Sequence, residues 1–363
     1  MSSVLKASLV LENGKTFEGY SFGSTTPVTG EVVFNTGMVG YPQTMTDPSY
    51  KEQILNFTYP LIGNYGVPEN TKDSNNISKF FESEKIQVKG IIVSDYSYDY
   101  SHYQAVKSLD AWMKEQNIPG ITGLNTRELT QTLREKGSML GKIIIEKKTR
   151  IQKMEDPNKR NLVAEVSTKE PVEYGSGKKT IAVLDYGVKN NILRSLLKRK
   201  IKVLKLPWDY DLFEHSEKFD GIVLSNGPGD PKIVTESINI VKKALETNTP
   251  TFGICLGNQL LALAAGANTY KLKFGHRSQN QPCIMQGTNS CQITSQNHGF
   301  AVDAKTLPKG WKEWFFNAND QTNEGIIHEK KPFMSVQFHP EAFPGPVDSN
   351  YLFDYFLKVV KWN

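Results

Sequence analysis

Residues 180–207 have the sequence TIAVLDYGVKNNILRSLLKRKIKVLKLP, which predicts an apolar strand, a helix and a second apolar strand. Two further strand–helix pairs follow, over residues 219–247 and 251–267. Strands that alternate with helices at this spacing are typical of a parallel sheet covered by helices on both faces. We therefore expect residues 180–363 to form an α/β domain with a mostly parallel, doubly wound sheet. In such a sheet the functional residues lie in the loops after the carboxyl ends of the strands.

The first part of the chain lacks this alternation. Residues 1–146 contain short alternating runs with a hairpin turn signal at Asn13–Gly14, and helix patterns over residues 103–116 and 126–137. This mixture predicts an α+β N-terminal domain that is rich in strands. Residues 147–179 are polar and charged and contain two prolines and a Gly-Ser-Gly, so they predict a linker between the two domains.

The composition indicates a folded protein of two domains. The chain has 363 residues, and the usual domain size of ~150 residues predicts two. Hydrophobic residues make up 38%, which supports buried cores and argues against a disordered chain. Lys and Arg number 43 against 38 Asp and Glu, and this net charge of +5 is too small to indicate a nucleic-acid partner. The densest basic stretch, residues 189–205, has apolar positions at helical spacing, which we interpret as a solvated helix face.

The expected environment is reducing and away from membranes. No apolar stretch reaches the ~20 residues of a membrane-spanning helix, and the first residues carry neither a signal-peptide core nor a transit pattern. Three cysteines, Cys255, Cys283 and Cys291, are too few for a disulfide framework. We therefore predict a cytoplasmic protein without membrane or nucleic-acid partners.

The sharpest motif is GICLG, residues 253–257, between the strand that ends at Ile254 and the helix that starts near Asn258. This pattern is a nucleophile elbow in which a cysteine stands where α/β-hydrolases have serine. The glycines give clearance at a sharp strand-to-helix turn, and the N–H groups of the helix favour a thiolate and can hold an oxyanion. A buried structural cysteine is the alternative interpretation of this motif taken alone.

Two further motifs supply what a nucleophilic cysteine needs. SVQFHPE, residues 335–341, places His339 at the end of an apolar strand and Glu341 two residues later. The nucleophile needs a base, and the base needs a carboxylate that fixes its tautomer. SNGPGDP, residues 225–231, follows another strand, and its glycines let backbone N–H groups approach a substrate. Taken singly, these motifs also fit a surface His–Glu pair and a plain turn, but together they favour a catalytic Cys255.

Together, GICLGNQ, SNGPGDP and VQFHPE resemble the motifs of a class I, or triad, glutamine amidotransferase domain. TSQNHGFAVD at residues 294–303, together with residues 30–66 and 120–142, narrows the resemblance to the small, glutaminase chain of carbamoyl-phosphate synthetase. The chain is most like the eukaryotic glutamine-dependent type. The resemblance covers nearly all of the chain apart from the linker and the last dozen residues. It implies that residues 1–146 are the N-terminal domain of such a small chain and residues 180–363 its amidotransferase domain.

The resemblance implies a role for each matching residue. Cys255 would attack the side-chain carboxamide of glutamine, His339 would act as general base and then acid, and Glu341 would orient His339. The backbone N–H groups of Leu256 and Gly227 would hold the oxyanion. The remaining positions that match glutamine-binding residues of the family are Ser49, Gly229, Gln259, Asn297, Gly299 and Phe300. Because Ser49 belongs to the first domain, the resemblance places the site at the domain boundary.

The resemblance also implies a partner. In the family, ammonia from L-glutamine passes to a large synthetase subunit or a fused synthetase domain, which makes carbamoyl phosphate for pyrimidine or arginine biosynthesis. This chain has no G-x-x-x-x-G-K-[ST] phosphate loop, so we expect no cofactor in it and assign ATP and magnesium to the partner. Cys283, Cys291 and His298 are not spaced like zinc ligands, so we expect no metal. Both a free-standing subunit and a part of a multifunctional fusion fit the sequence.

Two residues depart from the family pattern. Asn258 stands where members usually have His. Asparagine donates and accepts hydrogen bonds but does not titrate near neutral pH, so we interpret the change as tuning rather than loss of activity. Asn125 stands where members usually have Asp, and we expect it to change only local hydrogen bonds.

Two alternative functions compete with this hypothesis. The first is a catalytically silent scaffold that activates an ammonia-using synthetase; Asn258 favours it, whereas the retained Cys255, His339 and Glu341 argue against it. The second is another amidotransferase, such as the glutaminase of anthranilate or GMP synthetase. The TDPSY-type first domain, which does not precede those glutaminases, argues against the second alternative.

Overall fold

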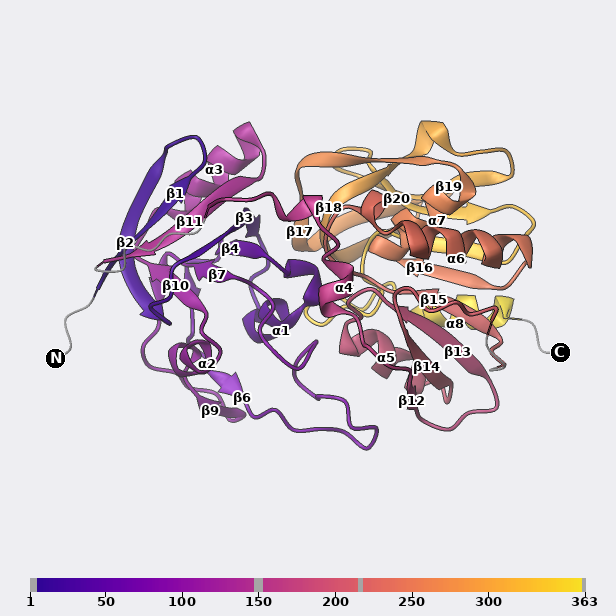
Figure 1. Cartoon of the computed structure of the whole chain (residues 1–363), viewed down its shortest axis with the longest axis horizontal. Helices are drawn as coiled ribbons and strands as arrows, with labels where there is room; N and C mark the ends of the chain where they lie inside the picture. Colours follow the sequence, from indigo (N-terminus) through magenta and orange to yellow (C-terminus); the bar gives the residue numbers. More distant parts are fainter. Residues whose placement is uncertain (1–4, 147–152, 215–217, 361–363) are drawn as a thin grey trace. The chain divides into compact units, whose positions relative to one another are not determined.

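The structure is a computed structural model that describes residues 5–146, 153–214 and 218–360. The chain divides into two compact units (Figure 1). The first unit contains residues 1–73 and 78–157, and the second contains residues 74–77 and 158–363.

The first unit is built around a closed sheet whose strands follow the order β1-β11-β3-β4-β7-β10-β2. Alternate residues of β1, namely Ala7, Leu9 and Leu11, are buried, which is the period-two pattern of a strand with one face on a core. The predicted hairpin at Asn13–Gly14 is confirmed, because β1 and β2 pair antiparallel and Gly14 has a φ of +87°. The elements of this unit are β1 (Lys6–Leu11), β2 (Thr16–Gly23), β3 (Val28–Asn35), α1 (Tyr41–Thr46), η1 (Pro48–Tyr50), β4 (Gln53–Phe57), β5 (Leu61–Ile62), β6 (Val67–Pro68), β7 (Gly90–Ile92), β8 (Asp95–Tyr96), β9 (Ala105–Lys107), α2 (Leu109–Glu115), β10 (Pro119–Thr122), α3 (Thr126–Lys136) and β11 (Met139–Ile145).

The two helices predicted for this unit are present, with one boundary shifted. The helix predicted over residues 103–116 begins at Leu109, because Ser108 caps it and the residues before it pair with β6 as β9. The second helix, α3, ends before Gly137 as predicted. Asn125 caps α3, since its Oδ1 accepts a hydrogen bond from the backbone N–H of Glu128 at 3.0 Å. Its effect is local, as expected.

The second unit contains a ten-stranded sheet in the order β12-β14-β13-β15-β16-β21-β20-β19-β17-β18. The neighbours from β14 to β21 in this order are parallel, and the other pairs are antiparallel. The elements of this unit are η2 (Pro157–Lys159), α4 (Val163–Val166), β12 (Val172–Tyr174), β13 (Thr180–Asp185), α5 (Asn190–Leu197), β14 (Lys202–Pro207), β15 (Gly221–Leu224), η3 (Pro231–Ile233), α6 (Thr235–Glu246), β16 (Thr251–Ile254), α7 (Leu256–Ala265), β17 (Asn268–Met285), β18 (Cys291–Asp303), η4 (Ala304–Thr306), β19 (Trp311–Asn317), β20 (Asn323–His328), β21 (Phe333–Val336) and α8 (Tyr351–Val359).

The α/β class of the second unit is confirmed, but its sheet is mixed rather than mostly parallel. After α7 the chain forms the long antiparallel pair β17–β18, continues through β19 and β20, and joins the parallel strands at β21. Antiparallel neighbours need only short connections, whereas parallel neighbours need a crossover. Residues 268–336, all of which are described, contain no helix longer than the single turn η4. The strand–helix alternation that led to the prediction therefore ends at residue 267.

Helices cover both faces of the parallel strands (Figure 1). Ile181 and Val183 of β13 belong to a core that includes residues of α5 and α8. Ala182 and Leu184 of the same strand belong to a second core that includes residues of α6 and α7. Because alternate residues of a strand point to opposite faces, α5 and α8 cover one face and α6 and α7 the other. This part of the sheet is doubly wound as predicted.

Part of the segment predicted as a linker belongs to the second unit. Residues 147–152 lie outside the described residues, but α4 and β12 form within the rest of the segment. The strand β12 pairs with β14 at the edge of the sheet, and Leu162 and Val163 are buried. The composition indicated a linker because these few apolar residues stand in a segment that is otherwise polar and charged.

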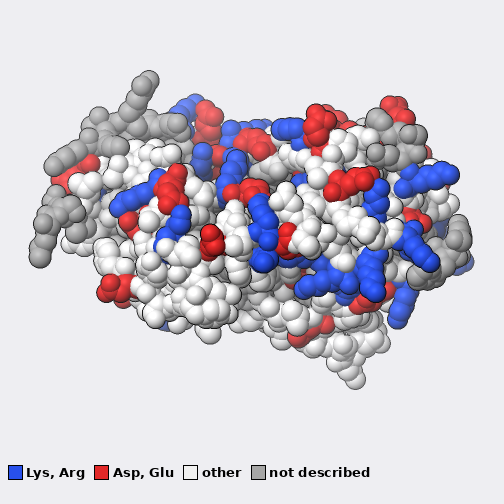
Figure 2. Space-filling view, turned by 90° about the horizontal axis from the view of Figure 1, so that it is seen from below, with Lys and Arg blue, Asp and Glu red and all other residues white. Residues whose placement is uncertain are grey.

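The charged surface shows acidic and basic side chains interspersed, with basic ones gathered on the right of the view in Figure 2. In the basic stretch 189–205, Arg199 pairs with Asp354 and Lys202 pairs with Glu173, each at 2.7 Å. Ile192, Leu193 and Leu196 of α5 are buried and Lys198 is exposed, so the predicted solvated helix face is confirmed for this part. None of the described helices has both the length and the apolar character required to span a membrane.

Candidate active site

Cys255 occupies the sharp turn between β16 and α7. Its φ of +56° and ψ of −104° are strained for a residue with a side chain. A Cβ on Gly253 would lie 2.5 Å from the carbonyl oxygen of Gly257, and one on Gly257 would lie 2.1 Å from the carbonyl oxygen of Leu224. The turn therefore requires both glycines of GICLG, as expected for a nucleophile elbow.

The thiol of Cys255 is buried at the amino end of α7. The residue is 2% exposed, and its S–H donates to the carbonyl oxygen of Asn297 at 3.6 Å. The helix directs unpaired N–H groups and the positive end of its dipole towards this position. Cys283 belongs to the same apolar core as Cys255 but lies within strand β17 rather than at a helix terminus, and burial raises the pKa of its thiol. Of these two buried cysteines, Cys255 has the environment of a nucleophile.

The strand β21 brings His339 and Glu341 to the same edge of the sheet as Cys255. The backbone N–H of Cys255 donates to the carbonyl oxygen of Val336, the last residue of β21, at 2.9 Å. His339 Nδ1 lies 2.6 Å from Glu341 Oε1, which orients the ring. The Nε2 atom of His339 is buried and has no hydrogen-bond partner of regular geometry among the described residues. This nitrogen is therefore available to exchange a proton with the thiol.

A buried lysine completes the site and was missed in the sequence. Lys189 Nζ lies 3.0 Å from Glu341 Oε1, with side-chain exposures of 4% and 0%, and also donates to the carbonyl oxygen of Ala342 at 2.6 Å. The prediction of a solvated helix face over residues 189–205 is wrong for Lys189, because this residue lies just before α5 and is buried. Its position just after the apolar strand β13, at the carboxyl edge of the sheet, is the signal that could have identified it.

The charges of these residues are coupled. Burial alone would lower the pKa of His339, but the negative charge of Glu341 and the neighbouring Cys255 thiol outweigh it and raise that pKa from 6.5 to about 10. Burial would raise the pKa of Glu341, but Lys189 and His339 outweigh it and lower that pKa from 4.5 to about 2. Lys189, Glu341 and protonated His339 together carry one positive charge, which a thiolate at Cys255 would neutralise. The site is therefore suited to a thiolate–imidazolium pair.

The two residues expected to hold the oxyanion are neighbours. A Cβ on Gly227 would lie 2.2 Å from the carbonyl oxygen of Tyr186 and 2.9 Å from Leu256 Cδ2, so the backbone of Gly227 packs directly beside Leu256. The N–H of Gly257 donates to the carbonyl oxygen of Ser225 at 3.0 Å, which ties the SNGPGDP loop to the first turn of α7. Leu256 is the first residue of the helix, so its N–H has no acceptor within the helix.

Several of the predicted glutamine-binding residues contact Cys255 or one another. Gln259 donates from Nε2 to the carbonyl oxygen of Phe300 at 2.9 Å, and the carbonyl oxygen of Asn297 accepts the thiol. Gly299 lies between these two residues of β18. Gly229 has a φ of +88° in the SNGPGDP loop. The structure thus brings the β18 residues and Gln259 together, and their contacts with glutamine stay a prediction.

Ser49 lies in the first unit. It is buried in η1, where its backbone N–H donates to Asp47 Oδ1 at 3.0 Å. Its predicted contact with glutamine, and with it a site at the domain boundary, stays a prediction.

Asn258 is fully buried and bonds to one residue of β21 and to one residue just after that strand. Its Oδ1 accepts a hydrogen bond from the hydroxyl of Ser335 at 2.7 Å, and its Nδ2 donates to Gln337 Oε1 at 3.1 Å. Gln337 Oε1 also accepts from Gln259 Nε2 at 3.1 Å. Asn258 makes these bonds with an uncharged amide. The bonds hold α7 against the end of β21, and Cys255, His339 and Glu341 keep their places.

A second group of buried titratable side chains lies behind β18. Potential ligand atoms of His276, His298 and Glu324 lie within 4.8 Å of one another, which is close enough for a metal ion. These atoms already make hydrogen bonds: His276 with Asp320, Glu324 and Gln296, and His298 with Gln296 and the carbonyl oxygen of Phe300. We interpret this group as a hydrogen-bond network, and the expected absence of a metal stays a prediction.

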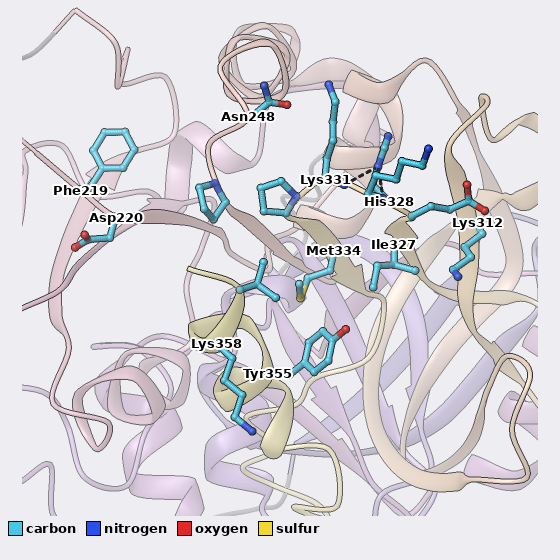
Figure 3. A pocket seen from close by; sticks show the side chains of 15 residues that line it. Phe219, Asp220, Asn248, Lys312, Ile327, His328, Lys331, Met334, Tyr355 and Lys358 are labelled. Carbon is cyan, nitrogen blue, oxygen red and sulfur yellow. Dashed lines mark hydrogen bonds between the residues drawn. The ribbon is translucent and has the colours of Figure 1, made fainter. Parts of the chain in front are cut away.

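A hollow of about 830 Å³ lies at the amino ends of the parallel strands, opposite the edge that carries Cys255 (Figure 3). Its lining includes Pro250 and Pro332, which precede β16 and β21, together with Lys312, Lys331 and Lys358. None of the predicted site residues belongs to this lining. The hollow is therefore separate from the catalytic edge.

Comparison with known proteins agrees with this geometry. Residues 182–359 match the family "Glutamine amidotransferase class-I", and residues 9–143 match the family "Carbamoyl-phosphate synthase small chain, CPSase domain". The carbamoyl phosphate synthase arginine-specific small chain of Saccharomyces cerevisiae is 50% identical over 366 residues, which cover 98% of this chain and 89% of that one.

Two longer proteins match equally well. The multifunctional protein CAD of Squalus acanthias is 53% identical over 98% of this chain, which spans 16% of that protein. The mitochondrial carbamoyl-phosphate synthase [ammonia] of Homo sapiens is 50% identical over 98% of this chain, which spans 24% of it. The matching region is thus a separate chain in some relatives and a small part of others. With both of its domains matched, the chain belongs to the carbamoyl-phosphate synthase small-chain family and carries a class I glutamine amidotransferase domain.

Proposed function

We propose that this chain hydrolyses glutamine to glutamate and ammonia at Cys255. One arrangement carries the proposal. A cysteine in a strained strand-to-helix turn lies beside a histidine that has one ring nitrogen bonded to Glu341 and the other without a partner of regular geometry among the described residues. This is the arrangement that nucleophilic catalysis by a thiol requires.

The first half of the reaction forms a thioester. The thiolate of Cys255 attacks the side-chain carboxamide carbon of glutamine, and the carbonyl electrons move onto oxygen. The N–H groups of Leu256 and Gly227 stabilise this oxyanion. When the oxyanion collapses, the C–N bond breaks and protonated His339 gives its proton to the departing nitrogen, which leaves as ammonia.

The second half releases glutamate. Neutral His339 takes a proton from water as the water oxygen attacks the thioester carbon. The C–S bond then breaks, which restores the thiolate of Cys255 beside protonated His339. In sum, glutamine and water give glutamate and ammonia, and Glu341 and Lys189 keep His339 oriented and charged throughout.

The ammonia is proposed to pass to a synthetase partner, either a large subunit or a fused domain, that makes carbamoyl phosphate. The match of residues 9–143 to the small-chain domain supports this proposal. ATP and magnesium would be used by the partner, and no cofactor is proposed for this chain. A reducing compartment such as the cytoplasm suits the chemistry, because Cys255 must remain a thiol.

A silent scaffold is the second candidate function. One relative with 50% identity is named for ammonia, so sequence similarity by itself does not separate the two candidates. The contacts among Cys255, His339, Glu341 and Lys189 favour the glutaminase, because a scaffold needs no thiolate–imidazolium pair.

Replacing the nucleophile tests the proposal. With the synthetase partner present, Cys255→Ser should abolish synthesis from glutamine and leave synthesis from added ammonia intact. Cys291→Ser is the matched control, because that cysteine is exposed, and it should retain both activities. Glutamine hydrolysis at the wild-type rate in Cys255→Ser would refute the mechanism.

A further inference from the structure

The segment that carries Glu341 has a strained backbone. Ala342 and Phe343, which follow Glu341 directly, have φ values of +55° and +56°. This left-handed conformation is unfavourable for residues with a side chain, and two such residues in a row persist only where neighbouring groups hold the chain. The geometry of the segment is therefore imposed by its surroundings.

Side chains from other elements hold the carbonyl oxygens of this segment. The donors belong to α5, to β18 and to the residues that directly precede α5 and α8. Each donor and the residue whose carbonyl oxygen accepts are Asn350 with Pro340 (3.1 Å), Asn191 with Glu341, Lys189 with Ala342 (2.6 Å) and Ser295 with Pro344 (3.0 Å). Of these donors, Asn191 holds the backbone of Glu341 itself.

Asn191 is oriented for this bond by its own helix, α5. Its Oδ1 accepts a hydrogen bond from Arg194 Nε at 3.0 Å, so its Nδ2 is the end of the amide that faces Glu341. The guanidinium of Arg194 also lies over the ring of Phe343, 4.9 Å from the ring centre. Residues three apart lie on one face of a helix, so a single face of α5 contacts both Glu341 and the strained Phe343.

The position of Glu341 matters because its carboxylate makes two close contacts of the site. Its Oε1 lies 2.6 Å from His339 Nδ1 and 3.0 Å from Lys189 Nζ. Both distances change if the backbone of Glu341 moves, and a displacement of about 1 Å in a catalytic arrangement can lower the rate ~100-fold. A bond that fixes the carbonyl oxygen of Glu341 therefore bears on the reaction through His339.

We propose that Asn191 is a positioning residue of the glutaminase site: its bond to the carbonyl oxygen of Glu341 keeps the Glu341 carboxylate on His339. The assignment rests on the proposed glutaminase function and deepens it, because it traces the orientation of the general base to an uncharged amide on α5. Asn191 belongs to the basic stretch 189–205, so that stretch supports the site with a second residue besides Lys189.

The test replaces Asn191 by a side chain of similar size that has no donor. Asn191→Leu removes no charge, so a change in the protonation of His339 reports the position of Glu341. The charged and titratable groups that face His339 are Glu341, Lys189, Cys255 and His298. The variant keeps all four.

For Asn191→Leu, kcat for glutamine hydrolysis should fall roughly 10- to 100-fold, whereas KM should change less than about 3-fold, because the base and not the substrate is displaced. The alkaline limb of the rate should move to lower pH by about one unit, since a displaced Glu341 raises the pKa of His339 less. Asn191→Gln, which keeps an amide donor on a longer stem, should recover part of kcat.

An unchanged kcat would overturn the assignment. A fall in kcat with the alkaline limb in place would also overturn it, because that result indicates a general structural role. Asn280→Leu, the same change at an exposed position of β17, is the matched control and should behave like the wild type. In the Cys255→Ser background, calorimetry should show that L-glutamine binds equally with and without Asn191→Leu, and lost binding would count against the assignment.

A titration that needs no turnover separates this assignment from the proposed function. In the full chain without glutamine, NMR of isotope-labelled histidine rings follows the protonation of His339, whose signal is assigned by its absence from His339→Asn. Asn191→Leu should lower the pH at which His339 loses its proton by about one unit. This shift in a chain that never releases ammonia would overturn the proposed function alone. Normal hydrolysis with an unshifted titration would overturn the role of Asn191 alone.

Discussion

His339 and His276 lie in the same unit, and each is buried against a carboxylate. His339 Nδ1 lies 2.6 Å from Glu341, whereas His276 has Asp320 at 2.9 Å from Nε2 and Glu324 at 3.3 Å from Nδ1. Burial lowers the pKa of both, but the acidic partners outweigh it and raise the pKa of His339 to about 10 and that of His276 to about 9. The two histidines differ in their second ring nitrogen: it is bonded in His276, and in His339 it lies beside the Cys255 thiol without a partner of regular geometry among the described residues.

The comparison shows that the charge of a buried histidine and its ability to transfer a proton have different causes. Acidic neighbours set the protonation state of a buried histidine, but proton transfer also needs a nitrogen that no other group holds. His276 uses both nitrogens to hold Gln296 of β18, Glu324 of β20 and Asp320 in the loop before β20, so its role is structural. His339 keeps Nε2 for the thiol, and Cys255 is held in a strained turn beside it.

The largest expected effect distinguishes the two histidines directly. His339→Asn should lower kcat for glutamine hydrolysis by at least ~10³-fold, as expected for loss of a triad base. His276→Asn should lower kcat by less than ~10-fold, because it removes a support and no reacting group. Ammonia release by the two purified variants is the measurement, and losses of similar size would show that the second ring nitrogen is not what distinguishes them.

Removing Lys189 tests whether the catalytic group depends on its buried counter-charge. Lys189→Met leaves Glu341 buried without its lysine, so the free energy of unfolding should fall by about 3–5 kcal/mol. The double variant Lys189→Met/Glu341→Gln should recover part of this loss, since neither unpaired charge remains. Urea unfolding of the single and double variants gives both values. A double variant less stable than the single variant would contradict the pairing.

The pH dependence should differ between the two histidines. The raised pKa of His339 stabilises the folded state fully below about pH 6.5, and this contribution is lost as the pH rises through about 10. Hydrolysis needs protonated His339, so its alkaline limb should lie near that value and move to lower pH in Glu341→Gln. Rates measured from pH 6 to 11 show the shift.

Asp320→Asn is the counterpart for His276. This change should lower the pKa of His276 and flatten the pH dependence of the unfolding free energy between about 6.5 and 9, the range over which that contribution is lost. It should leave the alkaline limb of hydrolysis unchanged. A limb that moves with Asp320 rather than Glu341 would reverse the two assignments.

The smallest expected effects concern the two asparagines that depart from the family pattern. Asn258→Ala removes the buried partner of the Ser335 hydroxyl and one of the two donors to Gln337 Oε1, and it should cost about 1–3 kcal/mol of stability. Asn125→Ala removes the cap of α3 and should cost about 1 kcal/mol. Thermal unfolding and ammonia release check both variants. A ~10³-fold fall in kcat for Asn258→Ala would place that residue in the chemistry.

The fold could be predicted where strands and helices alternate regularly over many residues. The alternation over residues 180–267 correctly predicts the strands and helices around the catalytic edge. It could not predict the antiparallel strands β17 to β20, because such strands need no crossover helix and leave no comparable pattern. The short strand β12 was missed because it lies in a polar stretch and is stabilised by pairing with β14 at the edge of the sheet.

The candidate site could be predicted where a motif combines a turn with a reactive side chain. Cys255, His339 and Glu341 follow strands directly, so their positions come from local sequence. Lys189 and Asn191 stand in a run of charged and polar residues that looks like solvated surface, and only the folding of a distant segment against them reveals their contacts with Glu341. Partners of this kind depend on tertiary structure.

The central claim is that Cys255 carries the substrate during turnover, and trapping the intermediate tests it most directly. The full chain is mixed with glutamine, quenched in acid during turnover, digested and analysed by mass spectrometry. We expect the mass of one glutamyl group on the peptide that contains Cys255, and its absence from Cys255→Ser. Sustained ammonia release without this adduct, at a rate unchanged in Cys255→Ser, would contradict the claim.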